Sequence, residues 1–88
     1  MAHEESHLRQ ALHDAIFEAA LLPATGPALA RAALRLRTAI LGPDEPELHA
    51  SAHGLVQAIE EARMRHDRVP SELGAACARV REWLVARR

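Results

Sequence analysis

Two pairs of histidines have the spacing that suits a metal ion. His3 and His7 form one pair, and His49 and His53 form the other. Residues four apart lie on one face of an α-helix, so each pair can present two imidazole groups to one ion. A metal- or ligand-responsive helical bundle that uses this His-rich end is therefore an alternative function, with His49 and His53 as the metal ligands.

Other residues weaken the metal hypothesis. Di-iron bundles carry inward Glu-x-x-His motifs on two helices, and this sequence does not have two such motifs. Three arginines, Arg37, Arg87 and Arg88, are expected at the same end as the histidines, where they would repel a cation. The simpler interpretation is that the histidines are solvated positions beside an apolar stripe, and we expect no cofactor.

A histidine phosphotransfer domain is also a small helical bundle with an exposed histidine. Members of that family typically show His-x-x-Lys-Gly. Here Ala50-Ser51-Ala52-His53 follows His49, and Gly54-Leu55-Val56-Gln57 follows His53, so the lysine and glycine are missing at both positions. The sequence favours two surface histidines on an amphipathic helix.

Residue types that serve as nucleophiles lack the surroundings that would activate them. Cys77 falls on an apolar stripe, where a buried and unreactive thiol is expected. Ser6, Ser51 and Ser71 have no strand-turn-helix context of the kind that hydrolases use. There is also no glycine-rich phosphate loop. The sequence predicts a protein that is not an enzyme.

Nucleic-acid binding is a further alternative. Arg31, Arg35 and Arg37 form a basic stripe, and a small nucleic-acid-associated regulator would use it. However, the net charge is −1, the pI is about 6.6, and Phe17 and Trp83 are the only aromatic residues. A near-neutral chain with two aromatics makes nucleic acid an unfavoured partner.

The remaining patterns predict four helices. Apolar residues recur at three- and four-residue spacing over residues 4–22, 27–41, 44–66 and 71–86, with Pro and Gly between the segments. Asp44 with Glu47 has the form of a capping box at the start of the third segment. Thr25 and Ser71 are the expected caps of the second and fourth segments.

Short connections favour antiparallel neighbours, so we predict an all-α, up-down-up-down four-helix bundle that forms one domain over residues 1–88. An alternative is that dimerisation completes or extends this bundle, because Ala-rich faces bury little area per residue.

Composition sets the location that we expect. Cys77 is the only cysteine, so the chain has no internal disulfide, and no apolar run approaches a membrane span. The start MAHEESH lacks the features of a signal peptide. All the fixed positive charges are arginine, as a GC-rich bacterial coding sequence would give. We expect a cytoplasmic protein.

These patterns together favour a small non-enzymatic module for protein–protein interaction or oligomerisation, in the role of an adaptor or regulatory subunit. Its partner would be a second copy, as a homodimer, or another helical protein. The contact candidates are apolar residues beyond the needs of a small core. They are Phe17, Leu21, Leu34, Trp83 and Val85.

Overall fold

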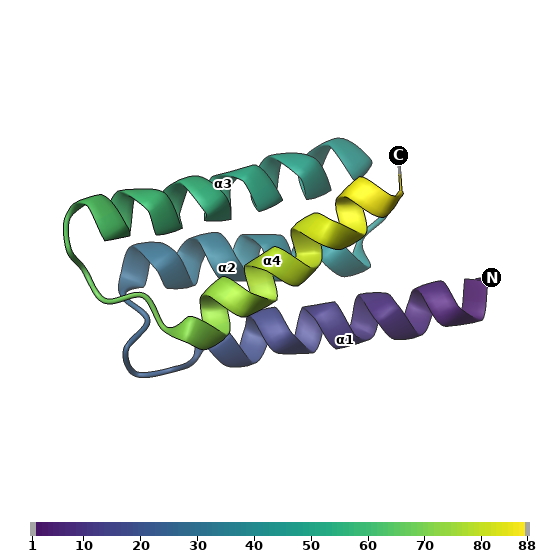
Figure 1. The fold of residues 1–88 in the computed structure, drawn as a ribbon. Helices are drawn as coiled ribbons and strands as arrows, with labels where there is room; N and C mark the ends of the chain where they lie inside the picture. The colour runs from purple at the N-terminus through teal and green to yellow at the C-terminus, as the bar shows by residue number, and fades with distance from the viewer. Residues whose placement is uncertain (1, 88) are drawn as a thin grey trace.

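The structure is a computed structural model that describes residues 2–87, with side chains from Glu4 onward. It contains four α-helices, and the described residues include no strand. Their bounds are α1 Ala2–Ala20, α2 Pro27–Leu41, α3 Glu45–Met64 and α4 Ser71–Ala86. The helices alternate in direction, and both chain ends lie at the same end of the molecule (Figure 1). The predicted up-down-up-down bundle is confirmed.

The helices form a ring in which each one packs against two neighbours. The packed pairs are α1–α2, α2–α3, α3–α4 and α1–α4, so α1 lies diagonally opposite α3. The bundle measures 41 × 21 × 17 Å along its principal axes. None of the described helices is long and apolar enough to cross a membrane.

Each helix contributes its apolar stripe to one core. The largest side chains that are completely enclosed include two from each helix: Leu12, Ile16, Leu36, Ile40, Leu48, Leu55, Leu73 and Val80. All of them except Ile16 fall on the apolar stripes that the spacing predicts. Many of the other core positions are alanines, which bring the helices close together but leave less apolar area to bury.

The first helix ends two residues earlier than predicted. It begins at Ala2 rather than residue 4 and ends at Ala20 rather than Leu22. The Leu22 N–H donates to the Ala19 carbonyl at 3.3 Å, which tightens the last turn, and the Thr25 hydroxyl donates to the same carbonyl at 2.7 Å. The prediction that Thr25 caps α2 is therefore wrong. Thr25 closes α1, and Gly26 precedes α2 without a side-chain cap.

The predicted cap of the third helix is confirmed in part. Asp44 is the N-cap, and its carboxylate accepts from the Glu47 N–H at 3.0 Å. The second half of the capping box is absent, because the Glu47 side chain instead pairs with Arg35 of α2. The helix ends at Met64 rather than at His66.

The fourth helix begins where predicted, but Ser71 is not its cap. Ser71 is the first helical residue, and Pro70 takes the N-cap position without a side-chain hydrogen bond. The Ser71 hydroxyl donates to the Glu72 carboxylate at 3.2 Å. Proline at this boundary ends the preceding segment without supplying a capping oxygen.

Candidate functional site

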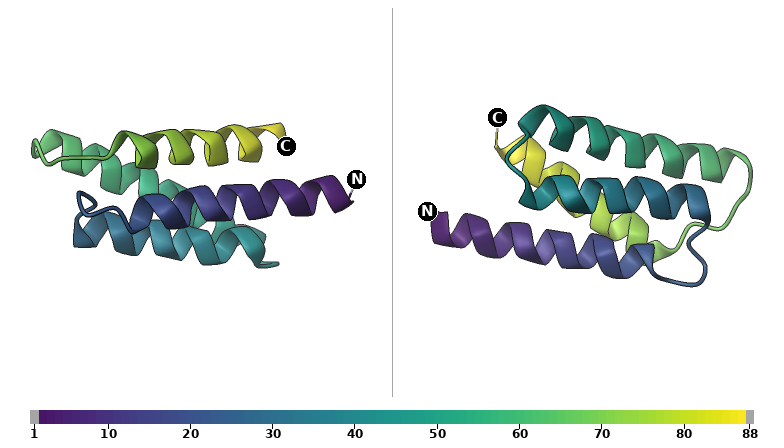
Figure 2. Two further views of the ribbon diagram at one scale, coloured as in Figure 1. Left: turned by 90° about the horizontal axis from the view of Figure 1, so that it is seen from below. Right: turned by 180° about the vertical axis from the view of Figure 1, so that it is seen from behind.

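The seam between α3 and α4 is packed less closely than the other three seams of the ring. The α4 helix starts beside the C-terminal end of α1 and crosses the bundle obliquely to end beside the start of α3 (Figures 1 and 2). Because α4 is tilted, it diverges from α3 toward its own N-terminal end. The two helices therefore enclose a groove, the α3–α4 groove, rather than a closed contact.

Two hollows make up the α3–α4 groove. The first measures about 200 Å³, where Ala52, Val56 and Leu84 provide the apolar surface. The second measures about 290 Å³ and lies along the diverging half, where Ile59, Cys77 and Ala78 line it. Small residues on both helices leave the groove open, because they do not span the distance between the two backbones.

The polar lining of the groove is mostly basic. His49, His53 and Arg81 line the first hollow, and Arg63, Arg81 and Glu60 line the second. Among the described residues, the guanidinium groups of Arg63 and Arg81 take part in no ion pair or hydrogen bond. The groove therefore presents cationic groups that are not neutralised within the chain.

The thiol that lines the groove is buried. Cys77 is buried, and its burial raises the pKa of the thiol, although Arg81 and Arg63 nearby oppose this effect. A thiol whose pKa lies above the usual range stays protonated near pH 7 and reacts slowly. The expectation that Cys77 is a buried core thiol is confirmed.

The side of α4 that faces away from the core borders the groove. We define the α4 outer face as Ser71, Ala75, Ala78, Glu82 and Val85, all of which are exposed. Val85 is 62% exposed, and it lines both the groove and a shallow hollow on α4 itself. An apolar side chain of this size at the surface is unremarkable alone, but here it continues a row of exposed alanines.

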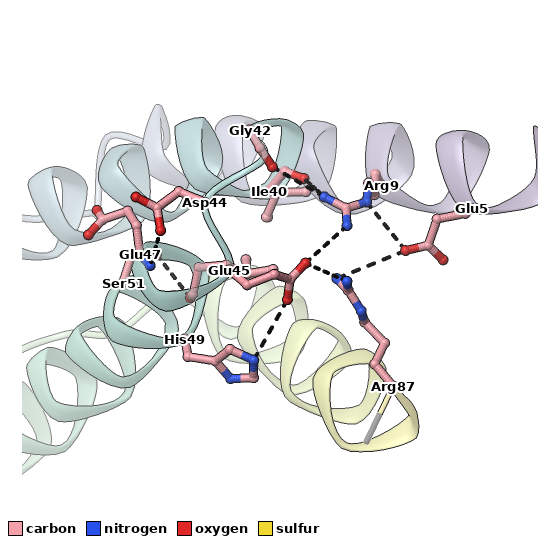
Figure 3. Close-up of polar contacts among 11 residues, drawn as sticks. Glu5, Arg9, Ile40, Gly42, Asp44, Glu45, Glu47, His49, Ser51 and Arg87 are labelled. Atoms are coloured by element: carbon pink, nitrogen blue, oxygen red, sulfur yellow. Dashed lines mark hydrogen bonds and ion pairs between the residues drawn. The ribbon is translucent and has the colours of Figure 1, made fainter. Parts of the chain in front are cut away.

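A cluster of four charged residues closes the end of the bundle where the chain ends meet (Figure 3). We call Glu5, Arg9, Glu45 and Arg87 the end cluster. The Glu45 carboxylate accepts from Arg9 at 3.5 Å and also from Arg87, while Glu5 accepts from Arg9 at 3.3 Å. These side chains come from α1, α3 and the residue that follows α4, so they connect three helices.

The end cluster also contacts the C-terminal end of α2. The Arg9 guanidinium donates to the carbonyls of Ile40 at 2.9 Å and Gly42 at 3.4 Å (Figure 3). Carbonyls at a helix C-terminus lack partners within the helix, and a cationic donor satisfies them favourably. Two acids pair with two arginines here, so the end cluster holds the ends of the helices together.

Neither a known protein family, nor a curated protein, nor a solved structure matches the chain.

The predicted metal ligands are only partly brought together. His49 and His53 both line the first hollow of the groove, and His49 lies 3.9 Å from the Glu45 carboxylate. The side chain of His3 lies outside the described residues, and His7 belongs to α1, which does not pack against α3. Within the described part of the chain, no three His, Cys, Asp or Glu residues are grouped to hold a metal ion.

The predicted nucleic-acid stripe is divided among different contacts. Arg35 forms a two-point ion pair with Glu47, with both N–O distances at 2.8 Å. This hydrogen bonding lowers the pKa of the Glu47 carboxyl and raises the pKa of Arg35. The Arg37 guanidinium lies 4.8 Å from the centroid of the Phe17 ring. Of these three arginines, only Arg31 is exposed and has no side-chain partner among the described residues.

The five contact candidates lie in different surroundings. Trp83 is buried in the core, and Leu34 is half-buried against it. Phe17 is half-buried beneath Arg37 on the α1–α2 side. Leu21 and Val85 are each 62% exposed. These side chains do not form a single patch, and among the five only Val85 borders the groove.

Several residues of these surfaces have no signal in the sequence. Glu45 lies 36 residues from Arg9 and 42 residues from Arg87, so no local spacing relates them. The basic lining of the groove likewise depends on the tilt of α4, which places Arg81 beside α3. The spacing of charged residues along the sequence predicts ion pairs within one helix, but it does not predict ion pairs between different helices.

Proposed function

We propose that this protein is a non-enzymatic helical interaction module that associates with a second copy of itself, in the role of an adaptor or regulatory subunit. The observation that carries the proposal is the exposed α4 outer face beside an incompletely packed seam. In a chain of 88 residues, such a surface is a large share of what is available for binding.

The chemistry of the groove supports an interaction role over catalysis. Burial raises the pKa of its thiol, and its arginines line the hollow together with apolar side chains. Catalytic sites typically combine a nucleophile with a base in hydrogen-bonding contact. An apolar surface with a charged rim is instead typical of a protein–protein interface.

Sedimentation of the wild-type protein tests the proposal. The expected result is a rise from the 9.6 kDa monomer toward twice that mass as the concentration increases. The surface is small, so we expect association at about 10–100 μM, the range of weak interfaces. A monomer at every concentration up to about 500 μM contradicts the proposal, because even weak association is detectable there.

A matched pair of variants tests which side of the molecule associates. Val85→Ser and Leu21→Ser each remove an apolar side chain of the same 62% exposure, from opposite ends of the bundle. We expect Val85→Ser to weaken association and Leu21→Ser to leave it unchanged. The opposite result would retain self-association but exclude the α4 side.

A further inference from the structure

The α4 helix carries two stripes, only one of which the core uses. Its buried stripe comprises Leu73, Ala76, Cys77, Val80, Trp83 and Leu84. The α4 outer face runs along the opposite side at intervals of four, three, four and three residues. This alternation is the spacing by which one helix forms a continuous contact with another.

The centre of the outer face permits close approach. Ala75 and Ala78 are both exposed and have no side chain beyond Cβ. Helices that meet through such small residues can pack at the short end of the usual interaxial range of about 8–10 Å. Hollows on both flanks of α4, one shared with α1 and one with α3, leave room for the longer side chains of a partner helix.

The flank of α4 beside α1 carries one acidic and one basic residue, so it is complementary in charge to the same flank of a second copy. Glu72 and Arg79 both line the hollow between α4 and α1, seven residues apart, with Ala75 between them. In the described chain, Arg79 has no ion pair with either Glu72 or Glu18, although Glu18 lines the same hollow. Two helices that run antiparallel about a two-fold axis bring each glutamate opposite the other copy's arginine.

The residues of the α4 outer face determine the direction in which the partner helix runs. In a parallel arrangement equal positions meet, so Glu82 would lie beside Glu82 of the second copy and repel it. In the antiparallel arrangement Ala75 meets Ala78, and Glu82 meets the neutral Ser71 rather than a second carboxylate. The outer face therefore complements itself in the antiparallel arrangement.

We infer that two copies associate through their α4 outer faces, antiparallel about an axis beside Ala75 and Ala78, with Glu72 of each paired with Arg79 of the other. This inference rests on the proposed self-association and adds its surface, direction and charge pairing. A helix of 16 residues is about 24 Å long. It offers less than the roughly 800 Å² per partner of a standard interface.

Charge reversal tests the pairing. Glu72→Arg and Arg79→Glu each place two like-charged pairs across the axis, so we expect the dimer dissociation constant to rise about tenfold in each. The double variant restores opposite charges, and we expect its dissociation constant to return to within about threefold of wild type. All are measured by sedimentation, with circular dichroism to verify folding.

The controls separate the pairing from net charge. Glu61→Arg and Arg31→Glu make the same charge changes at exposed positions on α3 and α2, and we expect both to dimerise like wild type. Ala78→Arg blocks the close approach at the axis, and we expect it to abolish dimerisation.

The outcomes distinguish the inference from the proposed function. A wild-type protein that stays monomeric overturns both. A dimer that Glu72→Arg, Arg79→Glu and Ala78→Arg all leave intact overturns the α4 interface and retains self-association. Single variants that weaken the dimer without restoration in the double variant overturn the antiparallel pairing.

Discussion

Trp83 is buried at the end of the bundle, with two guanidinium groups against its ring. The Arg9 and Arg87 guanidinium carbons lie 5.1 and 4.7 Å from the ring centroid. The face of an aromatic ring carries partial negative charge, so both contacts are attractive. The indole N–H is buried and has no hydrogen-bond partner in the described part of the chain. Trp83 therefore contributes through area and ring charge rather than through its polar atom.

Two substitutions at Trp83 separate these contributions. We expect Trp83→Ala to lower the free energy of unfolding by about 3–5 kcal/mol, because a large cavity opens beneath Arg9 and Arg87. Trp83→Phe keeps an aromatic ring and removes the unpaired N–H, so we expect a change of about 1 kcal/mol or less. Urea unfolding followed by circular dichroism measures both. Fluorescence is unsuitable, because both variants lack the only tryptophan of the chain. Equal losses in the two variants would contradict this account, because they would show that a phenyl ring does not replace the indole ring.

At the scale of the element, α3 ends with the one non-glycine residue in the described part of the chain that has a positive φ. His66 has a φ of 62°, in the left-handed region. Its N–H donates to the Arg63 carbonyl at 3.0 Å, and the Asp67 N–H donates to the Ala62 carbonyl at 2.8 Å. These two bonds form a Schellman motif, in which glycine usually takes the left-handed position. The missing glycine explains why the spacing alone placed the helix end too late.

One substitution should therefore have opposite effects at two positions. We expect His66→Gly to raise the free energy of unfolding by about 0.5–1 kcal/mol, because glycine adopts the left-handed conformation without strain. His53→Gly, at an exposed position inside α3, should lower it by about 0.5 kcal/mol through lost helix propensity. Thermal unfolding measures both. Destabilisation by His66→Gly would mean that the histidine side chain makes a contribution larger than the backbone strain.

Gly54, in the middle of α3, does not mark a close approach by another helix backbone. A Cβ at Gly54 would meet the Arg35 guanidinium at 3.8 Å, which is an ordinary contact. Gly54 therefore lies beneath an arginine side chain and not against another helix backbone. That arginine is the one that pairs with Glu47, so the α2–α3 contact at this point is polar.

At the scale of the whole molecule, α4 closes the ring and is also the helix that departs from parallel alignment. It supplies Leu73, Val80 and Trp83 to the core, and it packs against α1 and α3. A bundle of this size has a free energy of unfolding of roughly 4–13 kcal/mol, which is small compared with the contribution of a whole helix.

A chain that ends at Pro70 should therefore lose its fixed structure. We expect residues 1–70 to unfold without a cooperative thermal transition and to bind a dye that recognises apolar surface, because core side chains such as Ile16 and Leu55 become exposed. The full chain should unfold in a single transition. Cooperative unfolding of the shortened chain would show that α1–α3 form a core of their own.

The apolar spacing, the Pro and Gly breaks and the Asp44 cap determine four helices and their antiparallel order, because helix periodicity and short connections are local properties. The sequence also identifies Cys77 as a core thiol. The tilt of α4, the groove that it opens, the end cluster and the partners of Arg35 and Glu47 were decided only by the tertiary structure. They depend on which side chains from distant positions meet when the helices pack, and no spacing along the chain encodes that meeting.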